Sequence, residues 1–491
     1  MRTYADTIAG HPPGAIALST PDGEVSYGEL AARVDTLARA LAARGAGPEK
    51  VVAVAVDRSV DAVVAVAAVT RAGAAFLTLD TSQPAARLAG LVRSGGASLL
   101  VTADGVDIDL PVPGPPVLVT DTGDWPGALA PPRPDGLAYV SHTSGSTGEP
   151  SPVLVEHRGL DSYLRFIAAD YGLGPHTVAL QMAPMGYDAS IRDTFAPLLA
   201  GGRLVLLPRS ALLRPAEFGA AVARHGVNTI LSTTPSFLSF LAGQPDPAAL
   251  LGGMRLVVSS GESLRPFLSS GGRALVPGEL VNQYGPTECT MTSTRFRVPP
   301  DPEPEVDVVG EPVGGVVVRV LGDDLETVPD GDVGEVYIGG VGVARGYHGL
   351  PGRTAERFVP DPHGPPGARL YRTGDLARWG PGGLHFLGRG DRQVKIRGYR
   401  VDPAEVEGAL LTHPGVLGAV VSAEHDDRGR VFLVAHVAGD LGGATDGALR
   451  AHLAASLPPH LMPRRFVRLA ELPSTRSGKT DRRALSGSEG P

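Results

Sequence analysis

The chain has 491 residues, of which 43% are apolar, so it is long enough for at least two domains and too apolar for a mainly disordered protein. Its net charge of −8 argues against a nucleic-acid partner, because such proteins present a concentrated basic face. Cys289 is the only cysteine, which excludes an internal disulfide or a thiolate-rich zinc site and fits a reducing compartment.

The N-terminal part of the sequence carries no export or membrane signal. Residues 1–6 lack the apolar core of a signal peptide, and the most apolar stretch, 51–68, is interrupted by charged side chains. We therefore predict a cytoplasmic protein without a membrane partner.

Alternating apolar runs predict the fold of the larger part. Short β-branched runs at 51–56 and 75–79 flank an alanine-rich segment of helical period at 61–72, and a similar alternation continues from 204 to 281. This order is typical of parallel strands joined by helices, so we predict an α/β fold. Residues 109–134 are rich in proline and glycine and are predicted to form a surface connection.

The pattern changes toward the C-terminus. From 306 to 386 short apolar runs alternate with glycine-rich turns, which predicts a β-rich subdomain. After residue 390 we predict a small α+β domain, with helices at 402–411 and 447–457 and a strand at 431–437. The predicted domains are 1–390 and 391–491.

Three short motifs carry groups suited to a nucleotide. The first, 143–148, follows a predicted strand at 137–140 and combines glycines with hydroxylated residues, whose N–H and O–H groups can turn toward a phosphate. It is not a Walker A loop, since no Gly-Lys-Ser/Thr follows, and alone it would more often be a flexible turn.

The other two motifs are predicted turns. In 282–288 the ring of Tyr284 can stack on a base, and the Glu288 carboxylate can hold a magnesium ion. In 371–375 the carboxylate of Asp375 follows a tight turn and can accept hydrogen bonds from ribose hydroxyls. Each residue alone would be an ordinary turn former.

These motifs belong to a longer ordered series, which continues at residues 25–30, 71–76, 187–190, 334–347, 388–398, 457–463 and 477–482. With this series the chain resembles the ANL superfamily of adenylating enzymes, most closely the amino-acid-activating adenylation domains of nonribosomal peptide synthesis. The resemblance covers nearly the whole chain. It implies a large N-terminal domain of α/β sheets flanked by helices, with a β-rich subdomain, and a small, mobile C-terminal α+β domain.

The resemblance also implies which residues bind ATP and Mg²⁺. Tyr284 would stack on the adenine, Asn282 would read its amino edge, and Asp375 would bind the ribose hydroxyls. Glu288 would hold the magnesium ion. Further nucleotide and phosphate contacts are implied for Thr143, Ser144, Gly145, Ser146, Thr147, Gly148, Gly285, Thr287 and Arg389.

Lys479 is the implied catalytic residue, acting with Thr143 and Glu288. In the family this lysine lies on the mobile domain and reaches both the substrate carboxylate and the nucleotide, where cations offset the negative charge of the transition state. Asp391 matches the family's hinge, from which the small domain swings to bring 395–398 into the site for thioester formation. A plain loop aspartate is the alternative at that position.

One position departs from the family pattern. The phosphate loop of relatives continues with Lys-Gly, whereas Ser151 and Pro152 take those places here. Either a nearby arginine substitutes for the lysine, or pyrophosphate is held less tightly, or the enzyme is weakened. Because Lys479 and the nucleotide residues are present, we favour an active enzyme.

Asp188 matches the aspartate that pairs with the α-ammonium group of the substrate, which implies an amino acid rather than another acid. The other implied pocket positions are mostly polar: Ala189, Arg192, Ser232, Val258, Ser260, Gln283, Met291 and Thr292. Such a lining rejects a hydrocarbon side chain, and the guanidinium of Arg192 predicts a polar or acidic amino acid. Alternatively, Asp188 and Arg192 pair with each other across one helical turn.

No serine in the sequence setting of a phosphopantetheine attachment site follows Lys479. We therefore expect the activated amino acid to pass to a separate carrier protein with a phosphopantetheine arm. An amide-forming ligase, an acyl-CoA ligase and a degenerate, non-catalytic nucleotide- or amino-acid-binding protein are the alternatives. Some relatives need a small activator protein, and the sequence leaves open whether this chain does.

Overall fold

The computed structural model describes residues 3–106, 108–121, 123, 125, 129–144, 149–426, 430–439, 444–473 and 482–485. The chain divides into two compact units. The first comprises Met1–Thr81, Val92–Ser141 and Pro152–Gly390, and the second comprises Ser82–Leu91, His142–Ser151 and Asp391–Pro491. Two short segments that precede residue 390 thus belong to the second unit.

A seven-stranded sheet contains the first α/β alternation of the sequence. Its order is β18 (Gly346–Tyr347), β8 (Ser151–Glu156), β7 (Leu137–Thr143), β4 (Ala75–Thr78), β3 (Val51–Ala55), β5 (Ala97–Thr102) and β6 (Val117–Leu118). Helix α3 (Val60–Arg71) connects β3 to its parallel neighbour β4, as the pattern at 51–79 predicts. The hydroxyl of Ser59 caps this helix by accepting from the N–H of Ala62, and residues 62–70 are all buried.

A second, fourteen-stranded sheet belongs to the first unit. Its order is β16 (Val316–Leu321), β17 (Gly334–Gly340), β20 (Arg369–Gly380), β21 (Gly383–Arg389), β15 (Asp307–Pro312), β14 (Thr294–Arg297), β13 (Glu279–Tyr284), β12 (Leu256–Ser260), β11 (Thr229–Thr233), β9 (Val178–Leu180), β10 (Arg203–Val205), β1 (Ile16–Thr20) and β2 (Gly23–Ser26), with β19 (Phe358–Pro360) paired to β20.

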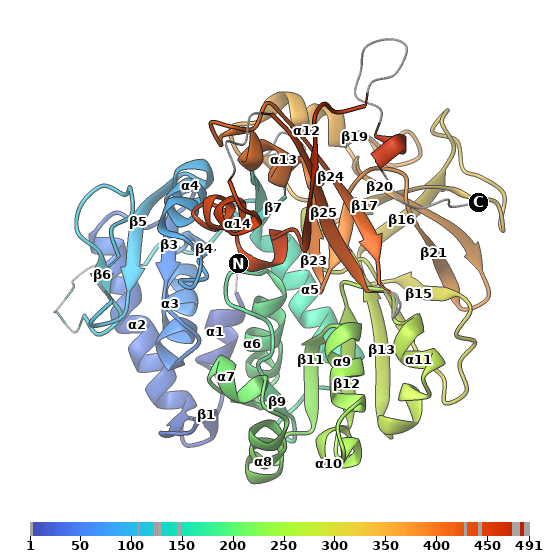
Figure 1. Cartoon of the computed structure of the whole chain (residues 1–491). Helices are drawn as coiled ribbons and strands as arrows, with labels where there is room; N and C mark the ends of the chain where they lie inside the picture. The colour runs from blue at the N-terminus through green and yellow to red at the C-terminus, as the bar shows by residue number, and fades with distance from the viewer. Residues whose placement is uncertain are drawn as a thin grey trace. The chain divides into compact units, whose positions relative to one another are not determined.

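The two halves of this sheet differ in direction. In spatial order, the strands β10, β9, β11, β12 and β13 pair in parallel. The strands β13, β14, β15, β21, β20, β17 and β16 pair antiparallel. Figure 1 shows β11, β12 and β13 side by side, with α9 (Pro235–Ala242) and α10 (Pro247–Leu251) next to them. Both the α/β alternation from 204 to 281 and the β-rich region from 306 to 386 are confirmed.

The other helical segments of the chain before residue 390 are α1 (Tyr4–Ile8), α2 (Tyr27–Ala43), α4 (Ala85–Gly95), α5 (His157–Asp170), α6 (Ala189–Leu199), α7 (Arg209–Leu212), α8 (Pro215–His225), α11 (Arg265–Ser269), η1 (Gly272–Leu275), η2 (Thr287–Cys289) and α12 (Pro351–Arg357). Among the described residues, no helix has both the length and the apolar composition that a bilayer span requires.

Two predicted turns proved to be strands. Residues 282–284 still belong to β13, and the chain turns only after Tyr284. Asp375 lies within β20, because Gly374, at φ 77°, is accommodated in a register irregularity between β17 and β20. An irregularity of this kind re-aims a side chain without ending the strand.

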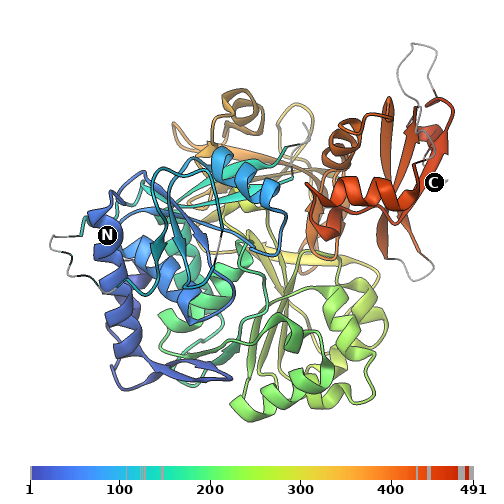
Figure 2. The same cartoon turned by 60° about the vertical axis from the view of Figure 1, so that its left-hand side comes forward.

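The second unit has an α+β fold. Its C-terminal part consists of the hairpin β22 (Val394–Ile396) and β23 (Tyr399–Val401), α13 (Pro403–Leu411), β24 (Gly418–His425), β25 (Val431–Ala438), α14 (Asp446–Ala454), η3 (Pro459–Leu461), β26 (Arg465–Leu469) and η4 (Arg483–Leu485). Its helices pack on its strands through a core that includes Val406, Leu449 and Leu453 (Figure 2). The helices predicted at 402–411 and 447–457 correspond to α13 and α14.

Candidate active site

The start of α6 presents Asp188 with one free carboxylate oxygen. Asp188 is the N-cap residue of α6, but its side chain makes no capping hydrogen bond. Its Oδ2 is buried and has no hydrogen-bond partner in the described part of the chain. Burial raises the pKa of Asp188, and hydrogen bonds from the Thr287 hydroxyl and the Ala189 N–H oppose that shift. A buried carboxylate oxygen without a donor is costly unless a cation or donor reaches it.

Four residues later, Arg192 points into a cluster of neutral side chains. It is 1% exposed, and its Nε and Nη2 donate to Ser232 Oγ at 3.0 and 2.6 Å. Its Nη1 donates to Gln283 Oε1, to Tyr163 Oη at 3.2 Å and to Thr292 Oγ1 at 3.3 Å. No carboxylate lies within ion-pair distance of Arg192 among the described residues. The alternative that Asp188 and Arg192 form an ion pair is therefore wrong, because the guanidinium donates its hydrogen bonds to hydroxyl and amide oxygens instead.

Two tyrosines of the region around α5 complete this cluster. Tyr163 Oη lies 3.0 Å from Thr292 Oγ1, and Gln283 Nε2 donates to Tyr171 Oη at 2.6 Å. The sequence analysis did not single out either tyrosine, because their spacing fits a buried helix face and only their hydroxyl groups distinguish them from core residues. Both are more than 100 residues from Gln283 or Thr292 in the sequence, so no local pattern links them.

The remaining predicted pocket residues lie on elements that meet at this place. Ser232, Ser260 and Gln283 are at or near the carboxyl ends of the neighbouring parallel strands β11, β12 and β13, where open α/β sheets bind ligands. Ser260 is the register partner of Gln283, and the carbonyl of Ala189 accepts from Ser232 Oγ at 3.2 Å. Val258 is fully buried on β12 and belongs to the core, without a polar contact to the cluster.

The loop after β13 is conformationally strained. Thr290 and Met291 adopt φ values of 59° and 71°, which few residues other than glycine adopt. At Gly285 an added Cβ would lie 2.5 Å from the N of Ser293, so this loop can fold back only onto a glycine. Strain of this kind is often stored where a loop lines a functional site.

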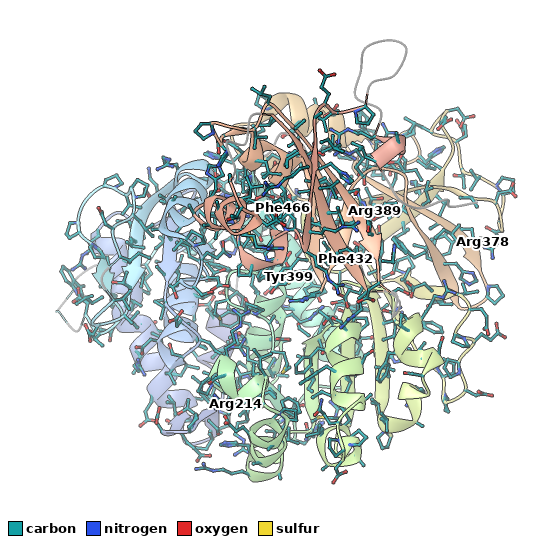
Figure 3. All side chains as sticks on the ribbon, in the orientation of Figure 1. Arg214, Arg378, Arg389, Tyr399, Phe432 and Phe466 are labelled. Atoms are coloured by element: carbon teal, nitrogen blue, oxygen red, sulfur yellow. The ribbon has the colours of Figure 1, made fainter. Side chains whose placement is uncertain are left out.

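The predicted nucleotide residues form a second cluster in the first unit. Tyr284 Oη donates to Asp375 Oδ2 at 2.5 Å, and the guanidinium of Arg389 donates to Asp375 Oδ1 and to the carbonyl of Thr373 at 2.9 Å. Arg389, labelled in Figure 3, lies opposite Asp375 in the β20–β21 register. Burial and the Asp375 charge raise the pKa of Tyr284. Asn282 instead donates to the carbonyl of Val308 at 2.9 Å.

Glu288 is the predicted magnesium residue. It is fully buried, and its Oε1 accepts from Tyr347 Oη at 2.8 Å. The described residues contain no group of three metal-ligating side chains. A single buried carboxylate such as Glu288 is a group through which proteins commonly hold Mg²⁺ together with substrate phosphates.

Other predicted residues lie elsewhere. Thr143 ends β7 and is buried, Ser144 Oγ donates to the carbonyl of Arg400 at 2.8 Å within the second unit, and Ser151 is buried at the start of β8. Asp391 begins the main segment of the second unit, and its Oδ1 accepts from the N–H of Gln393 at 3.1 Å. Lys479 and Gly145, Ser146, Thr147 and Gly148 lie outside the described residues.

Comparison with known families agrees with this geometry. The family model of AMP-binding enzymes matches residues 5–348, and the model of the AMP-binding enzyme C-terminal domain matches residues 405–479. The chain belongs to the AMP-binding enzyme family. It is an ATP-dependent adenylating ligase, and the resemblance to adenylation domains of nonribosomal peptide synthesis is confirmed.

Relatives of this AMP-binding enzyme include peptide synthetases. It is 41% identical to phosphinothricin tripeptide synthetase PhsB of Streptomyces viridochromogenes over 97% of the chain, and 36% identical to a dimodular nonribosomal peptide synthase of Bacillus subtilis over 96%. The chain spans only 41% and 20% of the lengths of these two relatives.

Solved structures share the whole fold. One is NpsA-ThdA of Klebsiella oxytoca, an artificially fused adenylation–PCP di-domain, with a TM-score of 0.83, 26% identity and coverage of 95% of this chain and 94% of that one. Another is the amide bond synthetase McbA of Marinactinospora thermotolerans, with a TM-score of 0.86, 25% identity and coverage of 98% and 99%.

Proposed function

We propose that this AMP-binding enzyme activates an α-amino acid with ATP. A carboxylate oxygen of the amino acid attacks the α-phosphorus, a new P–O bond forms, and the bond to the leaving pyrophosphate breaks, which gives aminoacyl-AMP and pyrophosphate. The observation that carries the proposal is the buried Asp188 Oδ2, whose missing partner a substrate ammonium would supply. Acids without an amino group would leave it unpaired.

The proposed domains divide the work. Residues 1–390 form the core that binds ATP and the amino acid, and 391–491 carry the catalytic Lys479 behind a hinge at Asp391. Thr143, Thr287 and the loop 143–148 would contact the phosphates. Tyr284 and Asn282 would hold the adenine, and Asp375 with Arg389 the ribose. Glu288 would hold Mg²⁺, which when bound supplies positive charge at the phosphates.

We further propose that the amino acid has a polar or acidic side chain. Arg192 is buried and its hydrogen-bond acceptors are neutral among the described residues, so a second anionic group on the substrate would give the guanidinium a charged acceptor. Its present acceptors, Ser232 and Thr292, are hydroxyls that can instead donate to that same group.

The activated amino acid would then pass to the phosphopantetheine thiol of a separate carrier protein. The thiol sulfur attacks the acyl carbon, AMP leaves, and a thioester forms. The joined adenylation and carrier domains of NpsA-ThdA support this acceptor.

A second candidate is direct amide formation, in which an amine takes the place of the thiol. The likeness to the amide bond synthetase McbA favours it. Ser151 and Pro152, in place of the Lys-Gly of relatives, favour a third, a degenerate protein that binds ATP without turning it over. An acyl-CoA ligase has no comparable support.

Amino-acid-dependent ATP–pyrophosphate exchange across a panel of amino acids tests the proposal. We expect exchange with a polar or acidic amino acid and none with the matching acid that lacks the α-amino group. Mass spectrometry then separates aminoacyl-carrier thioester from free amide. Tight ATP binding with no exchange for any amino acid would contradict the proposal and support the degenerate protein.

A further inference from the structure

The segment between β9 and α6, residues 181–188, carries Asp188 but has no regular secondary structure of its own. Its buried N–H and C=O groups therefore need partners outside a ladder or helix. Two charged side chains supply them at the start of the segment: Arg58, from the loop between β3 and α3, and Asp193, from α6.

Arg58 binds the backbone carbonyl groups at the start of segment 181–188. Its Nη1 donates to the carbonyl of Gln181, and its Nη2 donates to the carbonyls of Met182 and Ala183 at 2.9 and 3.0 Å. One guanidinium thus binds three consecutive carbonyls. Burial lowers the pKa of Arg58 to about 10, and the charge of Asp193 opposes that shift, so Arg58 remains charged at neutral pH.

Asp193 binds backbone N–H groups of the same segment. Its Oδ2 accepts from the N–H groups of Met182 and Ala183 at 3.0 and 2.9 Å, and the residue is 1% exposed. At Met182 and Ala183 both backbone polar groups are therefore fixed by a charged side chain. Asp193 is the direct neighbour of Arg192 on α6, so the helix that bears the pocket guanidinium also bears this anchor.

The rest of the segment is tied to α6 more weakly. Ser190 Oγ donates to the carbonyls of Tyr187 and Met185 at 2.6 and 3.2 Å, and Gln181 Nε2 donates to Thr194 Oγ1 at 3.2 Å. None of these bonds involves Asp188 Oδ2, which stays without a partner among the described residues. The segment is thus held from several sides while its one carboxylate is left open.

We infer that Arg58 and Asp193 are positioning residues for amino-acid activation, which hold segment 181–188 so that the Asp188 carboxylate is already in place for the substrate ammonium. This inference rests on the proposed function. Binding groups act well only when the surrounding residues fix them in the productive geometry, and a misplacement of about 1 Å costs roughly a hundredfold in rate. Removing either residue also leaves backbone groups of Met182 and Ala183 without their charged partner.

The test compares three variants with wild type in exchange assays: Asp193→Asn, Arg58→Gln and the double variant. We expect the KM for the amino acid to rise about tenfold in each single variant while the KM for ATP stays within about twofold. The amino-acid KM of the double variant should be no higher than that of the more impaired single variant, because both residues hold the same backbone segment and act as one unit. Asp361→Asn is the control: like Asp193, Asp361 accepts a backbone N–H, from His363 at 3.0 Å, and it pairs with Arg319 at 3.2 Å.

Ser190→Ala is a milder variant that keeps the inference testable if the charged variants do not fold. It removes two of the weaker ties, and we expect a rise of about threefold in the amino-acid KM alone. Variants that lose thermal stability with an unchanged amino-acid KM would overturn the inference, as would equal rises for ATP and amino acid. A wild-type chain with no exchange would instead overturn the proposed function itself.

Discussion

The two clusters of the first unit differ in how their charges are balanced. In the cluster proposed to bind the nucleotide, Asp375 accepts from both Arg389 and Tyr284, and Glu288 accepts from Tyr347. In the cluster proposed to bind the amino acid, Asp188 keeps one unpartnered oxygen among the described residues, and Arg192 donates only to neutral oxygens. The carboxylates of the first cluster have donors before a ligand arrives, whereas in the second cluster one Asp188 oxygen has no donor among the described residues and the Arg192 guanidinium has only neutral acceptors, so a ligand can still add partners there.

The largest effect is expected at Lys479, the proposed catalytic residue. Lys479→Arg keeps the charge but not the compact ammonium, so we expect adenylation to fall on the order of a thousandfold, about 4 kcal/mol of barrier. Pyrophosphate exchange with the preferred amino acid measures it, and Lys395→Arg, in the same unit, is the control. Near-normal exchange by Lys479→Arg would contradict the catalytic assignment.

Asp188→Asn tests the open carboxylate directly. We expect kcat/KM for the amino acid to fall by about a hundredfold or more, roughly 3 kcal/mol, because the ammonium loses a buried counter-ion. The Kd for ATP should change little. Asp361→Asn, which breaks the pair with Arg319 away from the cluster, is the control. Comparable losses in both variants would refute a substrate contact at Asp188.

Arg192→Ala tests the second open charge through substrate preference. Exchange with an acidic amino acid should fall at least about tenfold relative to exchange with apolar ones, because the guanidinium no longer balances the anion. The apolar amino acids of the same panel serve as the internal control. An unchanged ranking of acidic, amide and apolar substrates would show that Arg192 does not read the side chain.

Arg389→Lys tests the balanced cluster. A lysine cannot reproduce the bonds to both Asp375 and the Thr373 carbonyl, so we expect the KM for ATP to rise about tenfold and the free energy of unfolding to fall by about 1 kcal/mol. The amino-acid KM should not move. Arg372→Lys, at the exposed pair with Glu335, is the control. Lost stability with an unchanged ATP KM would mean that the cluster is structural only.

The smallest effect concerns pH and stability. Burial raises the pKa of Asp188 in the folded chain, so the folded state binds this proton more tightly than the unfolded state does. The resulting stabilisation is present below the unfolded pKa and is lost as pH rises through the folded pKa. Asp188→Asn, which cannot ionise, should therefore exceed wild type by about 1 kcal/mol at pH 7 and lose that advantage below about pH 4.

Urea unfolding of both proteins at the two pH values measures this difference. A variant that is less stable than wild type at pH 7 would show that the ionised Asp188 carboxylate stabilises the fold rather than straining it.

The sequence predicted the fold well because apolar periodicity is local. The alternation around 51–79 gave β3, α3 and β4 within one residue or so of their bounds. The prediction from the sequence was wrong at Gly374, before Asp375, where a predicted turn is part of a strand. The neighbouring strands, and not the local residues, decide whether a glycine ends a strand.

The site was predicted less completely. Motifs singled out Asp188, Arg192, Glu288 and Asp375 as candidate site residues, but the residues that surround them, such as Tyr163, Tyr347 and Arg58, are common residue types far away in the sequence. Their role follows from a hydroxyl or guanidinium reaching across the fold, and a single sequence carries no record of that contact.

Helix α6 also sets a length scale. Asp188 is its N-cap residue and Arg192 follows four residues later, an axial rise of about 6 Å that a rigid helix cannot adjust. In the proposed complex this rise sets the distance between the substrate ammonium at Asp188 and the side-chain anion at Arg192. The enzyme would then distinguish homologous amino acids that differ by a single methylene, and moving the guanidinium by one position would change the length of the side chain that it accepts.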